Sequence, residues 1–113
     1  MYIKKKKLRR TKAMIRHIVA WNYKEGFTEA ENKENAKKIK TELEALTQYI
    51  DGIIELKVHI NILRSSNRDI VLNSQFINEE ALASYQIHPE HKKVASFVCA
   101  VMQDRICIDY YEQ

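Results

Sequence analysis

Residues 82–91, Leu-Ala-Ser-Tyr-Gln-Ile-His-Pro-Glu-His, contain the one proline of this 113-residue chain and decide where two helices meet. Proline fits the first turn of a helix because its missing N–H needs no partner there, and it moves the preceding residue, His88, away from helical angles. The stretch therefore predicts one helix that ends just before His88 and a second that begins at Pro89. Tyr85 and His91 lie on either side of this kink, so the segment is either a ligand pocket or an ordered elbow.

Upstream of the kink, the apolar pattern predicts a strand, a helix and two further strands. Residues 14–23 are β-branched and aromatic on both faces, which is typical of a strand in a sheet covered on both sides. Apolar positions spaced by three and four predict a helix that begins with a capping box at Thr28 and runs to about Tyr49. Strict alternation predicts a strand over residues 53–63, and a further strand is expected over residues 69–76.

The remaining elements complete a recognisable order. Asn78 is expected to cap a short helix that ends near Gln86, an apolar stripe follows from Val94, and residues 105–111 are expected to form the last strand. The order β-α-β-β-α-β is the split βαβ, ferredoxin-like arrangement, an α+β fold whose antiparallel sheet carries its helices on one face. Because the first and last strands have apolar residues on both faces, we expect a second copy to cover the open face in a homodimeric α+β barrel.

Composition and length narrow the class of protein further. Apolar residues make up 45% of the chain and charged residues 30%, as in an ordinary globular domain. No apolar run approaches the roughly 20 residues that cross a bilayer, and no secretory signal is recognisable, so we expect a cytoplasmic protein without a membrane partner. Cys99 and Cys107 have no spacing typical of a disulfide or a metal site and are predicted to be buried free thiols.

The positive charge of the chain is concentrated at its start. Residues 1–13 hold seven of the 19 basic residues and no acid, which leaves 12 basic against 15 acidic residues for residues 14–113. We expect residues 1–13 to be a disordered, solvated extension and residues 14–113 to form the single domain. The extension is the one segment whose charge suits nucleic acid, and nucleic-acid binding is not expected of the rest.

Three segments carry a family resemblance. Met14-Ile15-Arg16-His17-Ile18-Val19, Tyr85-Gln86-Ile87-His88-Pro89-Glu90-His91 and Cys107-Ile108-Asp109-Tyr110 resemble the stress-responsive A/B barrel (Dabb) family of dimeric α+β barrels. The likeness covers Met14 to about Glu112. It implies a homodimer whose two sheets form a barrel, with a cavity between sheet and helices in each subunit.

The resemblance also implies candidate site residues. In a plant branch of this family that cyclises a linear polyketide, a tyrosine and the second histidine of His-Pro-x-His act on the substrate. Those positions match Tyr85 and His91 here, and a histidine of the first strand matches His17. Where that branch has a histidine at the start of the third strand, this chain has Asp69.

We therefore predict that the protein binds a small apolar or aromatic molecule in a cavity between sheet and helices. The predicted ligand-binding residues are His17, Trp21, Tyr85, His91 and Phe97. Such pockets combine apolar walls with a few polar groups. No tightly bound cofactor is predicted, and no metal site, because His88 and His91 at a spacing of three have no third ligand at a recognisable spacing.

Two alternatives remain open at this point. The first is an acid–base enzyme, polyketide cyclase-like or cofactor-free monooxygenase-like, in which His91 is the base and Tyr85 donates its O–H to a developing oxyanion. The second is a purely structural or assembly protein, in which His88 caps the second helix, His91 bonds to backbone and Tyr85 fills the core. His17 would then be a satisfied core histidine.

Overall fold

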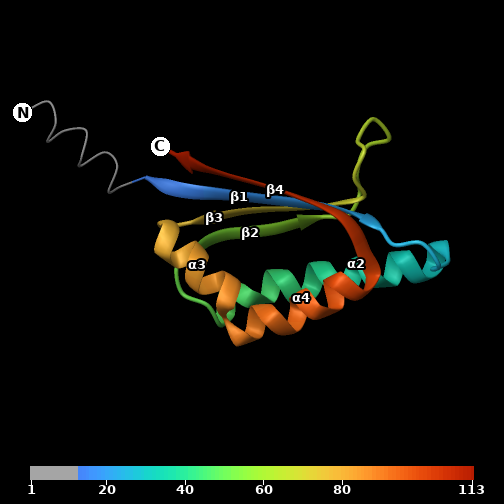
Figure 1. Ribbon diagram of the computed structural model, residues 1–113, viewed down its shortest axis with the longest axis horizontal. Coiled ribbons are helices and arrows are strands. Elements are labelled where there is room, and N and C mark those ends of the chain that lie inside the picture. The colour runs from blue at the N-terminus through green and yellow to red at the C-terminus, as the bar shows by residue number, and fades with distance from the viewer. Residues whose placement is uncertain (1–12) are drawn as a thin grey trace, which may run out of the picture.

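The computed structural model describes residues 13–113, which form one antiparallel sheet with every helix on the same face (Figure 1). The strands are β1 (Met14–Tyr23), β2 (Ile53–His59), β3 (Ile70–Phe76) and β4 (Met102–Glu112). The helices are α2 (Glu29–Glu44), α3 (Glu79–Ile87) and α4 (Pro89–Val101), with a 3₁₀ turn, η1 (Ala45–Gln48), after α2. The strands lie in the order β2-β3-β1-β4, so the first and last strands are neighbours. The predicted split βαβ arrangement is confirmed.

The helix boundaries follow the capping residues that the sequence predicts. The Thr28 hydroxyl accepts a hydrogen bond from the backbone N–H of Glu31, whose carboxylate accepts one from the N–H of Thr28. Asn78 caps α3 through its side-chain oxygen. His88 has extended backbone angles (φ −64°, ψ 134°), and its Nδ1 accepts from the N–H of Glu90 at 3.1 Å. The kink is therefore an ordered elbow in which His88 has a structural role.

Two predicted elements are too long. Helix α2 ends at Glu44 because the chain tightens into η1, where the N–H groups of Tyr49 and Ile50 both bond to the carbonyl of Leu46. Strand β2 ends at His59 and not at residue 63, since its partner β3 begins only at Ile70 and the residues beyond have no strand to pair with.

A bulge in β2 corrects the predicted alternation of that strand. The pairing of β2 with β3 shifts between Ile53 and Glu55, so one extra residue stands in β2. Leu56 and Val58 are buried as expected, but Ile54 is exposed. A bulge turns the residues on its two sides relative to each other, which is why Ile54 does not share the buried face.

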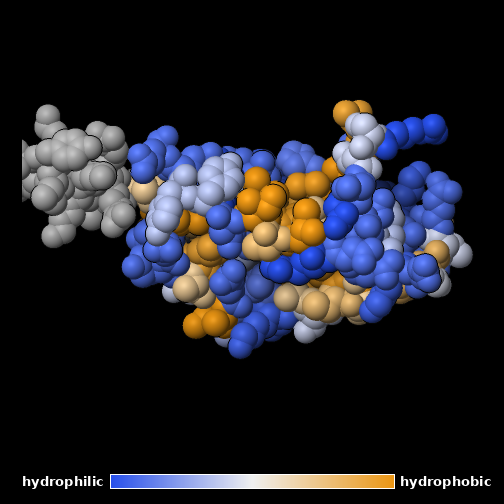
Figure 2. All heavy atoms as spheres, turned by 45° about the horizontal axis from the view of Figure 1, so that its top comes forward, coloured by the Kyte–Doolittle hydropathy of each residue, from blue (hydrophilic) through white to orange (hydrophobic). Residues whose placement is uncertain are grey.

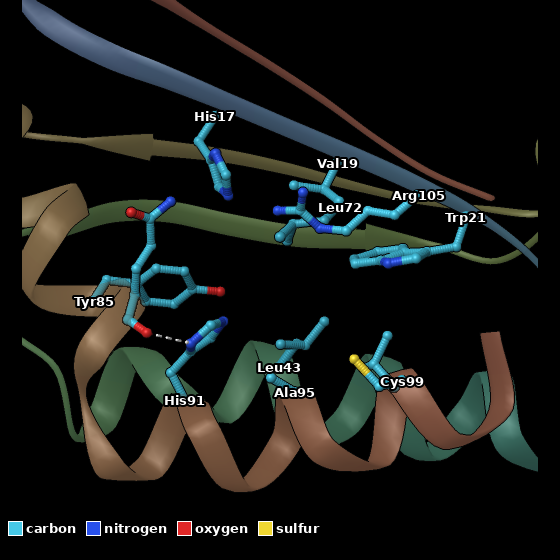
Figure 3. A pocket seen from close by; sticks show the side chains of 12 residues that line it. His17, Val19, Trp21, Leu43, Leu72, Tyr85, His91, Ala95, Cys99 and Arg105 are labelled. Carbon is cyan, nitrogen blue, oxygen red and sulfur yellow. Dashed lines mark hydrogen bonds between the residues drawn. The ribbon is translucent and has the colours of Figure 1, made fainter. Parts of the chain in front are cut away.

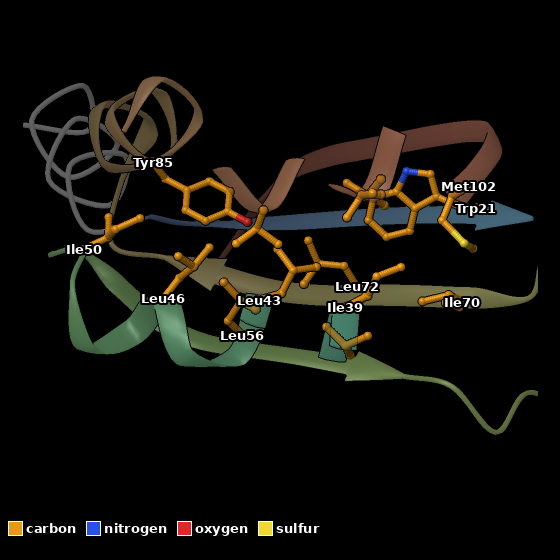
Figure 4. Close-up of a cluster of buried hydrophobic side chains, with 14 of the residues drawn as sticks. Trp21, Ile39, Leu43, Leu46, Ile50, Leu56, Ile70, Leu72, Tyr85 and Met102 are labelled. Atoms are coloured by element: carbon orange, nitrogen blue, oxygen red, sulfur yellow. The ribbon is translucent and has the colours of Figure 1, made fainter. Parts of the chain in front are cut away.

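The core fills the space between the sheet and the helices (Figure 4). Helix α2 contributes Ala36, Ile39 and Leu43, and η1 continues this buried face with Leu46. Tyr85 and Phe76 are the two largest fully buried side chains, with ring centroids 5.0 Å apart. This contact joins α3 to the end of β3, so core packing fixes the position of Tyr85.

The other face of the sheet has no helix over it. Three large side chains of β4 are exposed there: Ile106, Ile108 and Tyr110. Figure 2 shows hydrophobic side chains gathered on the surface of the molecule on this side. Ile108 pairs directly with Ile18 of β1, so the patch extends across both strands. The predicted two-sided apolar strands are therefore present, and one side is left uncovered in a single chain.

Several other predictions concern the ends and the thiols. The predicted extension of residues 1–13 lies outside the described residues apart from Ala13, which is buried.

Cys99 and Cys107 are free thiols, but both are exposed, so the prediction of burial is wrong. Cys107 lies on β4, which is an edge strand of the sheet. Within residues 13–113, no helix combines the length and apolar character that a membrane crossing requires.

Candidate functional site

A cavity of about 100 Å³ lies between β1 and the helices α3 and α4 (Figure 3). Its apolar walls are Val19, Trp21, Leu43, Leu72, Ala95 and Val98. Its polar lining is His17, Tyr85, Gln86, His91, Cys99 and Arg105. The structure thus brings together His17, Trp21, Tyr85 and His91, four of the five predicted ligand-binding residues.

Phe97, the fifth predicted residue, does not line this cavity. Ala95 and Cys99 follow His91 at successive spacings of four, so they share the helix face that looks into the cavity. Phe97 lies on another face of α4, where the ammonium of Lys38 is 4.3 Å from its ring centroid. Phe97 is only partly buried, and its apolar spacing did not indicate which neighbour it would meet.

Tyr85 is the most constrained polar group of the cavity. Its side chain is 1% exposed, and its hydroxyl points into the cavity without a hydrogen-bond partner among residues 13–113 (Figure 3). Burial raises the pKa of Tyr85 well above its usual value, so the hydroxyl keeps its proton at neutral pH. It is therefore a buried hydrogen-bond donor that faces the cavity.

His91 lies against Tyr85, with ring centroids 4.3 Å apart. Its Nδ1 is 3.2 Å from the carbonyl oxygen of Gln86. A carbonyl only accepts hydrogen bonds, so Nδ1 carries the proton and the Nε2 of the neutral ring is left as an acceptor. Burial is the main cause that lowers the pKa of His91; the bond to Gln86 opposes it, and the charges of His17 and Arg105 add to the lowering.

This lowered pKa predicts a pH-dependent stability. Between the usual histidine pKa of 6.5 and the lower pKa of folded His91, the unfolded chain binds a proton that the folded chain does not. The free energy of unfolding should therefore fall as the pH drops through this window and level off below it. We expect urea titrations from pH 8 to pH 5 to show this fall and His91→Gln to reduce it. An NMR titration that places the pKa of His91 at or above 6.5 would contradict the prediction.

His17 faces His91 and Tyr85 from the sheet side of the cavity (Figure 3). It is 2% exposed, and its Nδ1 is hydrogen-bonded to the carboxylate of Asp109, its direct partner in the pairing of β1 with β4. Because a carboxylate accepts, this bond places a proton on Nδ1. His17 is thus a paired histidine, and the carboxylate orients it.

Sequence reasoning did not assign Asp109 to the site. The alternation of Cys107, Ile108 and Asp109 indicated that the first and third of these share a face, but not which residue of another strand lies opposite. Asp69, which stands where the polyketide-cyclising branch has a histidine, accepts a hydrogen bond from the N–H of Tyr23 at 2.9 Å. It holds the end of β1 and does not line the cavity.

The side chains of His17, Cys107 and Asp109 offer donor atoms that lie within 4.8 Å of one another. Nitrogen, sulfur and carboxylate oxygen are donors that zinc accepts. Here the Asp109 carboxylate already binds His17 Nδ1, and the positive Arg105 side chain is hydrogen-bonded to Cys107. Both features oppose a cation, so the three residues are best described as a hydrogen-bonded cluster.

Together, the sheet order and the helices on one face of the sheet define a ferredoxin-like α+β protein. The model of the stress-responsive A/B barrel domain family matches residues 15–112. The chain belongs to this family.

Solved structures agree with this assignment. A dimeric ferredoxin-like protein of unknown function from Bacteroides fragilis is 27% identical, with a TM-score of 0.82 over 88% of this chain and 96% of that one. A Dabb family protein from Mesorhizobium loti is 23% identical, with a TM-score of 0.66 over 89% of this chain and 98% of that one. A hydroxynitrile lyase from Passiflora edulis is 15% identical, with a TM-score of 0.74 over 90% and 95% of the two chains. No curated protein matches the chain.

Proposed function

We propose that this protein is a cytoplasmic homodimer that binds a small apolar or aromatic molecule in the cavity of each subunit. The observation that carries the proposal is the Tyr85 hydroxyl, which is buried, protonated and without a hydrogen-bond partner among residues 13–113 at the wall of the cavity. A buried polar group without a partner destabilises a fold by about 1–3 kcal/mol. A ligand that accepts a hydrogen bond from Tyr85 would offset that cost.

The size of the cavity limits the ligand. An apolar cavity of roughly 150 Å³ accommodates benzene, and the present one has about 100 Å³. We therefore expect a ligand no larger than one small ring or a short chain, with one acceptor atom. Trp21 and Leu72 would contact its apolar part, and Tyr85 would bind the acceptor.

Two further observations support the homodimer and its location. The exposed apolar side chains of β4 form a contiguous patch of the kind that marks protein contacts, and the Bacteroides fragilis relative is dimeric. Free thiols at Cys99 and Cys107 are typical of a reducing compartment and so favour the cytoplasm.

Acid–base catalysis is the second candidate function. If Tyr85 donates its O–H to a ketone oxygen, His91 Nε2 can remove a proton from the adjacent carbon, and the developing oxyanion is held by the tyrosine. The fold is shared with a hydroxynitrile lyase, although at 15% identity this likeness supports the fold alone. We expect an enzyme of this kind to exchange the α-protons of cyclopentanone in D₂O, followed by NMR, and to lose the exchange in His91→Gln.

Trp21 provides a direct assay for binding, because it is the one tryptophan of the chain and it lines the cavity. We expect cyclopentanone to quench its fluorescence in a saturable way. Tyr85→Phe should weaken this binding roughly tenfold through loss of one hydrogen bond. The same change should leave the free energy of unfolding unchanged or raise it by about 1 kcal/mol, because it removes an unpaired hydroxyl.

Tyr49→Phe is the matched control, since Tyr49 is exposed and does not line the cavity. It should change neither the affinity for cyclopentanone nor the free energy of unfolding. If no small ring or chain saturates the Trp21 signal, the binding function is wrong and a purely structural or assembly role is favoured. If Tyr85→Phe clearly destabilises the protein, the hydroxyl has a partner in solution and the main support for the proposal is lost.

A further inference from the structure

We propose that the ligand of this cavity carries a carboxylate, which Arg105 binds at the cavity mouth. The inference rests on the proposed binding function and narrows it to one substrate class, a small apolar carboxylic acid. Three features support it. The side chain of Arg105 lines the cavity, no carboxylate of residues 13–113 forms an ion pair with it, and a guanidinium has the shape to bind a carboxylate.

Arg105 stands on the edge strand β4, and its side chain points into the cavity (Figure 3). Sequence reasoning placed residue 105 at the start of a strand and gave it no role. The residue itself is exposed, so the guanidinium is at the boundary between the cavity and solvent. A ligand could therefore keep its charged group at the mouth while its apolar part lies beside Trp21.

Arg105 carries the one fixed charge among the residues that line the cavity. No carboxylate of residues 13–113 forms an ion pair with it, and the nearby Asp109 is hydrogen-bonded to His17. Its side chain contacts the neutral thiol of Cys107. Burial raises the pKa of Tyr85 and lowers that of His91; the positive charge of Arg105 opposes the first shift and adds to the second, so its field reaches the interior of the cavity.

A guanidinium presents two parallel N–H groups that match the two oxygens of a carboxylate, and such charge-assisted pairs are stronger than neutral hydrogen bonds. The positive charge of Arg105 disfavours a cation at the cavity mouth. A carboxylate at Arg105 leaves the neutral ring or chain for the apolar walls, and a polar substituent on that ring could accept from Tyr85.

The test compares cyclopentanecarboxylate with cyclopentanecarboxamide, which has nearly the same shape without the charge. Trp21 fluorescence reports the binding of both. We expect the carboxylate to bind the wild-type protein at least about tenfold more tightly than the amide. Arg105→Met should remove this preference, Arg105→Lys should retain part of it, and Arg64→Met, which removes a positive charge from an exposed loop residue, should leave it unchanged.

The outcomes separate this inference from the proposed function. Equal affinities for the two compounds, or a preference that survives in Arg105→Met, would overturn the carboxylate while leaving ligand binding intact. Failure of both compounds and of cyclopentanone to bind would overturn both proposals. If Arg105→Met does not fold by circular dichroism, the wild-type protein still decides, since added salt should weaken binding of the carboxylate and spare the amide. Equal salt dependence would contradict the inference.

Discussion

Replacing Ile108 with aspartate is expected to convert the proposed dimer into a monomer of 13.4 kDa. Ile108 is 53% exposed in the single chain and lies on the open face of the sheet, opposite Ile18 of the neighbouring strand. If two sheets pack face to face, this side chain becomes buried, and an unpaired carboxylate there would be strongly unfavourable. Sedimentation at micromolar concentration distinguishes a dimer from a monomer directly.

Leu63→Asp is the control for this experiment. Leu63 is also an exposed large apolar residue, but it belongs to the loop between β2 and β3 and not to the open face. The same introduced charge should leave the dimer intact at this position. A dimer that persists in Ile108→Asp would show that the contact uses another surface.

Replacing Phe76 with alanine is expected to reduce the free energy of unfolding by about 3–5 kcal/mol. Phe76 is 0% exposed at the end of β3 and packs on Tyr85 and His17, with ring centroids at 5.0 Å and 6.1 Å. Its removal leaves a void directly behind the Tyr85 ring. The ring can then move away from the cavity, so we also expect ligand binding to weaken.

Urea unfolding followed at a fixed protein concentration measures this effect, since the stability of a dimer depends on concentration. The next residue provides a matched control: Ile77 is exposed, and Ile77→Ala should change stability by less than about 1 kcal/mol. A loss of less than about 1 kcal/mol in Phe76→Ala would contradict the account of the core around Tyr85.

The fold could be predicted from the sequence because local signals agree with one another. The capping residues Thr28 and Asn78 mark helix starts, and Pro89 separates two helices at the position where they meet. Apolar spacing distinguishes the helices from the strands. These signals act over a few residues and need no knowledge of what lies opposite.

The details that failed depend on contacts between distant segments. The pairing of His17 with Asp109 spans 92 positions and is set by the register of β1 and β4. Exposure of Cys107 depends on which strand forms the edge of the sheet, and the side of α4 that faces the cavity excludes Phe97. Composition and periodicity carry no information on these choices, because each is decided by packing of the whole domain.

The candidate site was likewise predictable only in part from the sequence. Tyr85 and His91 could be found from the His-Pro-x-His segment, and the cavity does unite them with His17. The sequence could not predict that the Tyr85 hydroxyl has no partner among residues 13–113, because a sequence does not tell whether a buried donor finds an acceptor. In the proposed function, this unsatisfied group favours a ligand that has an acceptor atom.

A crystal structure of the protein soaked with cyclopentanone tests the central claim most directly. The account predicts one ring in the cavity, with its carbonyl oxygen about 2.7 Å from the Tyr85 hydroxyl. A structure in which Tyr85 instead bonds to a protein group, and the ketone is absent or bound elsewhere, would contradict it.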